Sequence, residues 1–121
     1  MDYKVKYENW ISSEYLCSEG VAELKKISED DEAIKDAFGA ELEFGTAGMR
    51  GIIGYGTNRM NVYTVRRATK GLADFIKSKG KAAMQRGVAI SYDTRNKSEL
   101  FARAAAGVLL YNDIKVYVYP E

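Results

Sequence analysis

The chain has 121 residues, of which 46% are hydrophobic and 29% are charged, as in an ordinary globular protein. Lysine and arginine together number 18 and aspartate and glutamate 17, so the net charge of +1 gives no reason to expect nucleic acid or an anionic membrane as the main partner. One cysteine and no histidine exclude an internal disulfide and any catalytic site that needs histidine, and they leave almost no route to a zinc site. The N-terminus lacks the apolar core of a signal peptide, and the longest apolar stretch, 104–111, is too short to span a bilayer, so we expect a cytoplasmic protein.

Three helices are predicted in the first 39 residues. In the first, over 3–17, large apolar side chains recur at helical spacing and form one face, made of Tyr3, Tyr7, Trp10 and Ile11. That face either joins the protein's own core, which the pattern favours, or docks onto a partner chain. The second helix is expected over 21–27, and the third from an N-cap at Ser28 to a stop at Gly39.

Residues 40–61 change character, because glycine and asparagine punctuate short apolar pairs, and this pattern predicts short strands and tight turns. Within it, residues 44–51 combine glycines, whose backbone can approach an oxyanion closely, with a hydroxyl donor at Thr46 and a guanidinium fork at Arg50. This composition suits an anion cradle. A glycine-rich hairpin with a solvated arginine fits the same residues, and both interpretations stay open.

A long helix is predicted over 62–79, with Asn61 as its N-cap and Gly80 as its end, and residues 81–86 are polar enough to form a loop. Basic residues gather in and before this helix, at Arg59, Arg66, Arg67 and Lys70. A nucleic-acid surface would need more positive charge overall and exposed aromatic residues among the basic ones, so a solvated helix face is the better interpretation.

The last third of the chain predicts a βαβ unit over 87–119. A strand at 88–92 is followed by a helix that Asn96 can cap and that runs to about Tyr111, and a second strand follows at 116–119. Two strands joined by a crossover helix should be parallel.

A second candidate site follows the first of these strands. Asp93 and Arg95 lie at its carboxyl end, where ligands bind in open α/β sheets, and they lead into a helix N-terminus, which favours anions. Asp93 then orients Arg95 or acts as a base. In the alternative interpretation, Asp93 satisfies turn amides and Arg95 faces water.

Three strings of this sequence together resemble the α-D-phosphohexomutase superfamily. They are Glu43-Phe44-Gly45-Thr46-Ala47-Gly48-Met49-Arg50-Gly51, Gly56-Thr57-Asn58-Arg59-Met60-Asn61 and Ser91-Tyr92-Asp93-Thr94-Arg95. The resemblance covers essentially the whole chain. It is strongest to bacterial phosphoglucomutases that are themselves similar to the eukaryotic phosphoglucomutase/phosphopentomutase branch.

The resemblance implies an α/β fold: a three-layer α/β/α domain with a small mixed sheet and the βαβ unit at 87–119. Residues 1–121 would be one domain, with a helical N-terminal extension over about 1–39. The implied reaction interconverts glucose 1-phosphate and glucose 6-phosphate. A phosphoserine carrying Mg²⁺ gives its phosphoryl group to the sugar phosphate, and the intermediate, glucose 1,6-bisphosphate, reorients and returns the other phosphate.

On this chain, the resemblance implies that Arg50 contacts the phosphosugar and that Thr46 and Gly48 shape the same loop. It also implies that Asp93 and Arg95 support the phosphoserine site. The family's Thr-Ala-Ser-His-Asn-Pro serine loop and Asp-Gly-Asp-x-Asp-Arg metal loop do not occur in this sequence. We therefore expect an incomplete first domain with no catalytic residue and no metal ligand of its own, inactive alone. Its uncovered surfaces favour homodimers or strand exchange.

Two other functions remain open for the residues taken alone: a phosphate- or anion-binding module and an oligomerisation module, neither with catalysis. Within the family, the loops that discriminate between sugars lie elsewhere. The sequence therefore does not decide between glucose, mannose and pentose phosphates.

Overall fold

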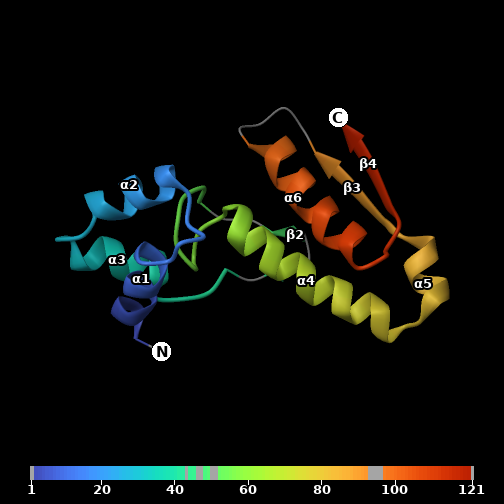
Figure 1. The fold of residues 1–121 in the computed structure, drawn as a ribbon, viewed down its shortest axis with the longest axis horizontal. Coiled ribbons are helices and arrows are strands. Elements are labelled where there is room, and N and C mark those ends of the chain that lie inside the picture. The colour runs from blue at the N-terminus through green and yellow to red at the C-terminus, as the bar shows by residue number, and fades with distance from the viewer. Residues whose placement is uncertain (1, 43, 46–47, 50–51, 93–96, 121) are drawn as a thin grey trace. The chain divides into compact units, whose positions relative to one another are not determined.

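The computed structural model describes residues 2–42, 44–45, 48–49, 52–92 and 97–120. The chain divides into two compact units, Met1–Thr64 and Val65–Glu121, whose elements are labelled in Figure 1. The single domain over 1–121, with its helical extension over about 1–39, stays a prediction.

The first unit begins with the three helices α1 (Tyr3–Ile11), α2 (Ser18–Lys26) and α3 (Asp31–Phe38). The expected helix over 3–17 is thus too long. It ends because the Ser12 hydroxyl donates to the Glu8 carbonyl at 2.6 Å, a local bond that competes with continued helix.

The boundaries of the next two helices also differ from those predicted. α2 starts three residues earlier, with Cys17 at its N-cap and Gly20 inside the helix. The N-cap of α3 is Asp30 and not Ser28, because the Asp30 carboxylate accepts from the Ala33 amide at 3.1 Å. Asp31 in the first turn adds the negative charge that suits a helix N-terminus.

The core of the first unit centres on Phe38, which is fully buried. The rings of Tyr7 and Trp10 meet it edge to face, with centroids at 5.8 and 5.6 Å. The Tyr7 hydroxyl donates to the Leu24 carbonyl at 2.7 Å, so its polar end is satisfied inside the core. The aromatic face of α1 therefore packs within its own chain, as the pattern favours.

The first unit also contains the short strands and turns predicted for 40–61. Strands β1 (Phe44–Gly45) and β2 (Gly48–Met49) pair antiparallel, with Phe44 opposite Met49 and Gly45 opposite Gly48.

The elements that follow are α4 (Val62–Ser78), α5 (Lys81–Arg86), β3 (Val88–Tyr92), α6 (Ser98–Tyr111) and β4 (Val116–Pro120), with α4 beginning in the last residues of the first unit. The expected loop at 81–86 is wrong, because this segment is the helix α5. Its side chains include good helix formers, and Gly80 and Gly87 bound it in conformations with positive φ of 96° and 82°.

The βαβ unit is confirmed. β3 and β4 are parallel, with Val88 opposite Val116 and Tyr92 opposite Pro120, and Figure 1 shows α6 lying along the pair. α6 begins at Ser98 with Lys97 at its N-cap, and the predicted cap, Asn96, lies outside the described residues.

The core of the second unit joins α4, α6 and the chain entering β4 through Ala73, Leu109 and Ile114. Side chains from α5, β3 and β4 pack against this cluster, at Met84, Val88, Ile90 and Val116. The α/β class is confirmed, and the described strands form one antiparallel and one parallel pair. Among the described helices, none has the length and apolar character to cross a bilayer.

Replacement of Phe38 by alanine should reduce the free energy of unfolding of the first unit by about 3–5 kcal/mol, because it empties a fully buried aromatic site. Denaturant titration followed by the fluorescence of Trp10, the chain's one tryptophan, measures this directly, since Trp10 contacts Phe38. The matched control is Tyr15→Ala, because the Tyr15 side chain is 80% exposed and its loss should cost less than about 0.5 kcal/mol. Equal losses in the two variants would contradict this core.

Candidate functional site

The first candidate site is the glycine-rich segment, residues 44–51. Of its three predicted site residues, Gly48 lies in β2, where its backbone pairs with Gly45. Thr46 and Arg50 lie outside the described residues, so their roles stay predictions.

The chain on both sides of the glycine-rich segment is held by residues 54–61, which we call the clamp segment. On the entering side, the Leu42 amide donates to the Thr57 carbonyl at 2.8 Å. On the leaving side, the Met60 amide donates to the Ile52 carbonyl at 2.8 Å, and the Gly54 amide donates to the Met60 carbonyl at 3.2 Å. The two ends of the glycine-rich segment are therefore fixed to one piece of backbone.

The clamp segment is itself tied to the C-terminal end of α3. The buried Thr57 side chain donates to the Ala40 carbonyl at 2.7 Å, and the Asn58 amide donates to the Ala37 carbonyl at 2.9 Å. Arg59 adds an ion pair with Asp36 and a 3.0 Å bond to the Asp36 carbonyl. Through α3, these contacts connect the clamp segment, and with it the glycine-rich segment, to the aromatic core.

Asn61 organises the clamp segment from within. Its side chain is buried, and its amide nitrogen lies within hydrogen-bond reach of three carbonyls, at 2.9 Å from Gly54, 3.2 Å from Gly56 and 3.4 Å from Arg59. One side-chain amide thus closes the turn from residue 54 to residue 61.

The other end of the same side chain starts α4. The Asn61 side-chain oxygen accepts from the Thr64 main-chain amide at 3.0 Å, and the Asn61 main-chain amide donates to the Thr64 hydroxyl at 3.1 Å. This is a reciprocal cap, which confirms Asn61 as the N-cap. The sequence predicts this cap but not the contacts of the Asn61 side chain with the three carbonyls. The one signal of this residue in the sequence is the Asn-x-x-Thr spacing.

Gly56 shows why the clamp segment needs glycine. Its φ is +135°, and a Cβ there would lie 2.6 Å from the Ala37 carbonyl oxygen. Any side chain would push the clamp segment away from α3.

A polar cluster attaches the clamp segment to α2. The sulfur of Cys17 lies 3.4 Å from the Tyr55 hydroxyl, and the Cys17 amide donates to the Tyr63 hydroxyl at 3.0 Å. The hydrogen bond to Tyr55 lowers the pKa of the Cys17 thiol, and burial raises the pKa of Tyr55 well above its ordinary value. A protonated phenol therefore faces a thiol that ionises more easily than usual.

The second candidate site follows β3. This strand ends at Tyr92, so Asp93 directly follows the carboxyl end of a parallel strand, as the sequence predicts. Asp93 and Arg95 lie outside the described residues, and their roles stay predictions. Among the residues that the structure describes, no three Asp, Glu, Cys or His side chains gather closely enough to hold a metal ion.

Residues 41–120, which contain both candidate sites, match the family described as phosphoglucomutase/phosphomannomutase, alpha/beta/alpha domain I. The chain is 36% identical over 112 residues to the phosphopentomutase of Mus musculus, a match that covers 88% of this chain and 18% of that protein. It is 34% identical over 110 residues to the phosphoglucomutase of Staphylococcus epidermidis, covering 91% and 19%. It is 38% identical over 92 residues to the probable phosphoribomutase of Schizosaccharomyces pombe, covering 76% and 16%.

The βαβ unit and the glycine-rich segment thus both lie within a stretch of the chain that matches an alpha/beta/alpha domain. The chain belongs to the phosphoglucomutase/phosphomannomutase family, and its residues 41–120 match that family's domain I. It spans less than a fifth of the length of these curated relatives. No solved structure is significantly similar to it.

Loss of the Asn61 side chain should loosen both ends of the glycine-rich segment. Asn61→Ala removes a helix cap and leaves buried carbonyls unpaired, so the free energy of unfolding should fall by roughly 2–4 kcal/mol. Asn61→Asp keeps the cap oxygen but cannot donate to the carbonyls, so it should also destabilise the chain. Amide hydrogen exchange at Leu42 and Met60 should accelerate in both variants and stay unchanged in the surface control Asn9→Ala. Wild-type exchange in Asn61→Asp would show that the donated bonds do not hold the clamp segment.

Removal of the Tyr55 hydroxyl should make the Cys17 thiol less acidic. In Tyr55→Phe the hydrogen bond that favours the thiolate is absent, so the midpoint of the alkylation rate against pH should move upward, toward the ordinary thiol value of 9.0. Iodoacetamide modification across a pH series, followed by mass spectrometry, gives this midpoint. The exposed Tyr15→Phe serves as control, and an unchanged midpoint in Tyr55→Phe would rule out the assigned cause.

Proposed function

We propose that this chain forms the first domain of a cytoplasmic phosphoglucomutase that interconverts glucose 1-phosphate and glucose 6-phosphate through a phosphoserine and glucose 1,6-bisphosphate. The observation that carries the proposal is the family match over residues 41–120, which contains both the glycine-rich segment and the string 91–95. The clamp segment supports it, because a phosphate loop binds best when its ends are already fixed.

In this proposal Arg50 binds oxygens of the sugar phosphate through its planar guanidinium, and Thr46 and Gly48 shape the surrounding backbone. Asp93 and Arg95 support the phosphoserine. Phosphoryl transfer depends mainly on positioning and on stabilisation of charge, which are the two things that clamped backbone amides and arginines supply.

The serine and the metal are proposed to come from family loops whose strings do not occur in these 121 residues. We propose Mg²⁺ only for the whole enzyme, and the steps assigned to this chain are binding and positioning. The chain alone should accordingly not turn over phosphosugars.

A second candidate function is pentose phosphate isomerisation, because relatives at 36% and 38% identity are named phosphopentomutase and probable phosphoribomutase. A third is a binding or oligomerisation module without catalysis, in which uncovered strand edges mediate homodimers or strand exchange. Sedimentation across a concentration series distinguishes this third function, since an anion-binding domain of an enzyme need not associate.

Arg50→Ala tests the main proposal. In a chimaera that places this chain in the corresponding segment of the S. epidermidis phosphoglucomutase, the change should lower kcat/KM for glucose 1-phosphate about 10- to 100-fold, because a charge-assisted bond to phosphate contributes roughly 1.5–3 kcal/mol. Arg50→Lys keeps the positive charge but lacks the planar guanidinium, so its kcat/KM should lie between those of the parent and of Arg50→Ala. Arg86→Ala, on the exposed helix α5, is the control.

The same chimaera assayed with ribose 1-phosphate separates glucose from pentose preference. An Arg50→Ala chimaera as active as its parent would overturn the role of this arginine.

A further inference from the structure

A hollow of about 540 Å³ lies between α4 and α6 in the second unit. Its volume is within the range of roughly 300–1,000 Å³ that small-molecule sites occupy. The basic residues Arg66, Arg67 and Lys70 of α4 line it together with Arg103 of α6. The sequence favours a solvated helix face for three of these residues, but the structure places a concave surface beside them.

The hollow has a cationic end and an aromatic end. Lys77 near the end of α4 lies 3.4 Å from the Asn112 side chain at the end of α6, so the two helices run in the same direction along the hollow (Figure 1). The basic residues of α4 therefore lie toward the Arg103 end of α6. Tyr111, which also lines the hollow, follows Arg103 by two turns, or roughly 12 Å along the helix axis.

Between these two ends the hollow is lined by Gly107, which has no side chain to fill it. Arg103, Gly107 and Tyr111 succeed one another at spacings of four residues and share one face of α6. A Cβ on Gly107 would meet no atom within 4 Å, so the space above this residue is open.

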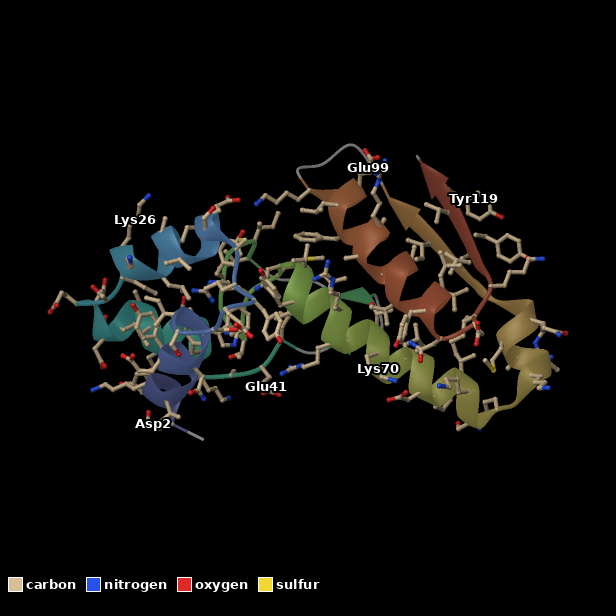
Figure 2. The ribbon with its side chains drawn as sticks, viewed as in Figure 1. Asp2, Lys26, Glu41, Lys70, Glu99 and Tyr119 are labelled. Atoms are coloured by element: carbon tan, nitrogen blue, oxygen red, sulfur yellow. The ribbon has the colours of Figure 1, made fainter. Side chains whose placement is uncertain are left out.

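Three charges of the hollow, those of Arg66, Lys70 and Arg103, are available at small cost. Within the described part of the chain, Arg66 makes no ion pair or hydrogen bond. Lys70 pairs with Asp74 and Arg103 with Glu99, both at 2.7 Å and one helical turn apart, and Figure 2 labels Lys70 and Glu99 on these two helices. Exposed pairs of this kind contribute little to stability, so an anion of higher charge can replace the carboxylates.

Tyr111 completes the site. Its side chain is 89% exposed and makes no contact that would occupy the ring in the described part of the chain. An exposed aromatic ring two helical turns from a group of four cations suits a ligand with a flat apolar end and a polyanionic end.

We propose that the hollow between α4 and α6 binds a nucleoside polyphosphate. Its phosphates contact Arg66, Arg67, Lys70 and Arg103, and its base stacks on Tyr111. The distance of roughly 12 Å between Arg103 and Tyr111 is comparable to the separation of base and terminal phosphate in an extended nucleoside diphosphate. The proposal rests on residues of α4 and α6 alone and does not depend on the proposed mutase function.

The test is titration of the 121-residue chain with ADP, inorganic pyrophosphate and adenosine at low salt, followed by amide chemical shifts. ADP should shift amides along the Arg103–Tyr111 face and bind more tightly than either part. Arg66→Glu should weaken ADP and pyrophosphate about tenfold or more, and Tyr111→Ala should weaken ADP about 5- to 100-fold while leaving pyrophosphate unchanged. Arg86→Glu, outside the hollow, controls for net charge.

A blocking variant keeps the test independent of stability. Gly107→Leu fills the hollow yet suits a helix interior, so it should keep or raise the melting temperature while abolishing ADP binding. Gly71→Leu is its matched control, since Gly71 lies in α4 with the same open space but does not line the hollow. The proposal is overturned by absence of ADP binding at low salt, by ADP shifts that map to the glycine-rich segment, or by Gly107→Leu binding ADP as wild type. Equal affinities for ADP and pyrophosphate would also overturn it, because the base would then contribute nothing.

Discussion

Two main-chain hydrogen bonds, from Leu42 to Thr57 and from Met60 to Ile52, carry the constraint on which the candidate site depends. Glycine loses more conformational freedom on ordering than any other residue, so a free segment rich in glycine would bear a large entropic cost on closing around a phosphate. Because both ends of the glycine-rich segment are fixed to one turn, much of this conformational entropy is already lost when the chain folds. Within this turn, the side-chain amide of Asn61 lies within hydrogen-bond reach of three main-chain carbonyls. A small number of polar contacts therefore links the aromatic core of the first unit to the segment proposed to meet the substrate.

The elements of the fold could be predicted largely from periodicity. The apolar spacing in α1, α4 and α6 located all three helices, and the apolar runs at 88–92 and 116–119 located the parallel pair. The errors lie where a local side-chain bond or a glycine decides the outcome. Ser12 ends α1 early and Asp30 caps α3 in place of Ser28, while two glycines of positive φ allow a helix in a stretch that is polar enough to predict a loop.

The candidate sites were predictable to a different degree. Sequence strings located the glycine-rich segment and the end of β3, because glycine, arginine and aspartate at those spacings carry recognisable chemistry. The clamp segment was not predictable, because the bonds by which it holds the two ends of the glycine-rich segment join main-chain atoms and would form with many side chains at the same positions. Gly56 and Asn61 are two residues that record it in the sequence, and both also fit an ordinary turn followed by a helix cap. The hollow between α4 and α6 was missed for a related reason: charge along a helix says nothing about the shape of the neighbouring surface.

The parallel pairing of β3 and β4 has a consequence for how the protein is made. Each residue pair of this ladder is separated by the whole of α6, so its formation requires closure of a long stretch of chain, whereas the β1–β2 ladder is entirely local. During synthesis β3 leaves the ribosome well before β4, the strand with which it pairs. Its open edge is therefore exposed to other chains in the interval, and this period is when chaperone binding would most improve the yield of folded protein.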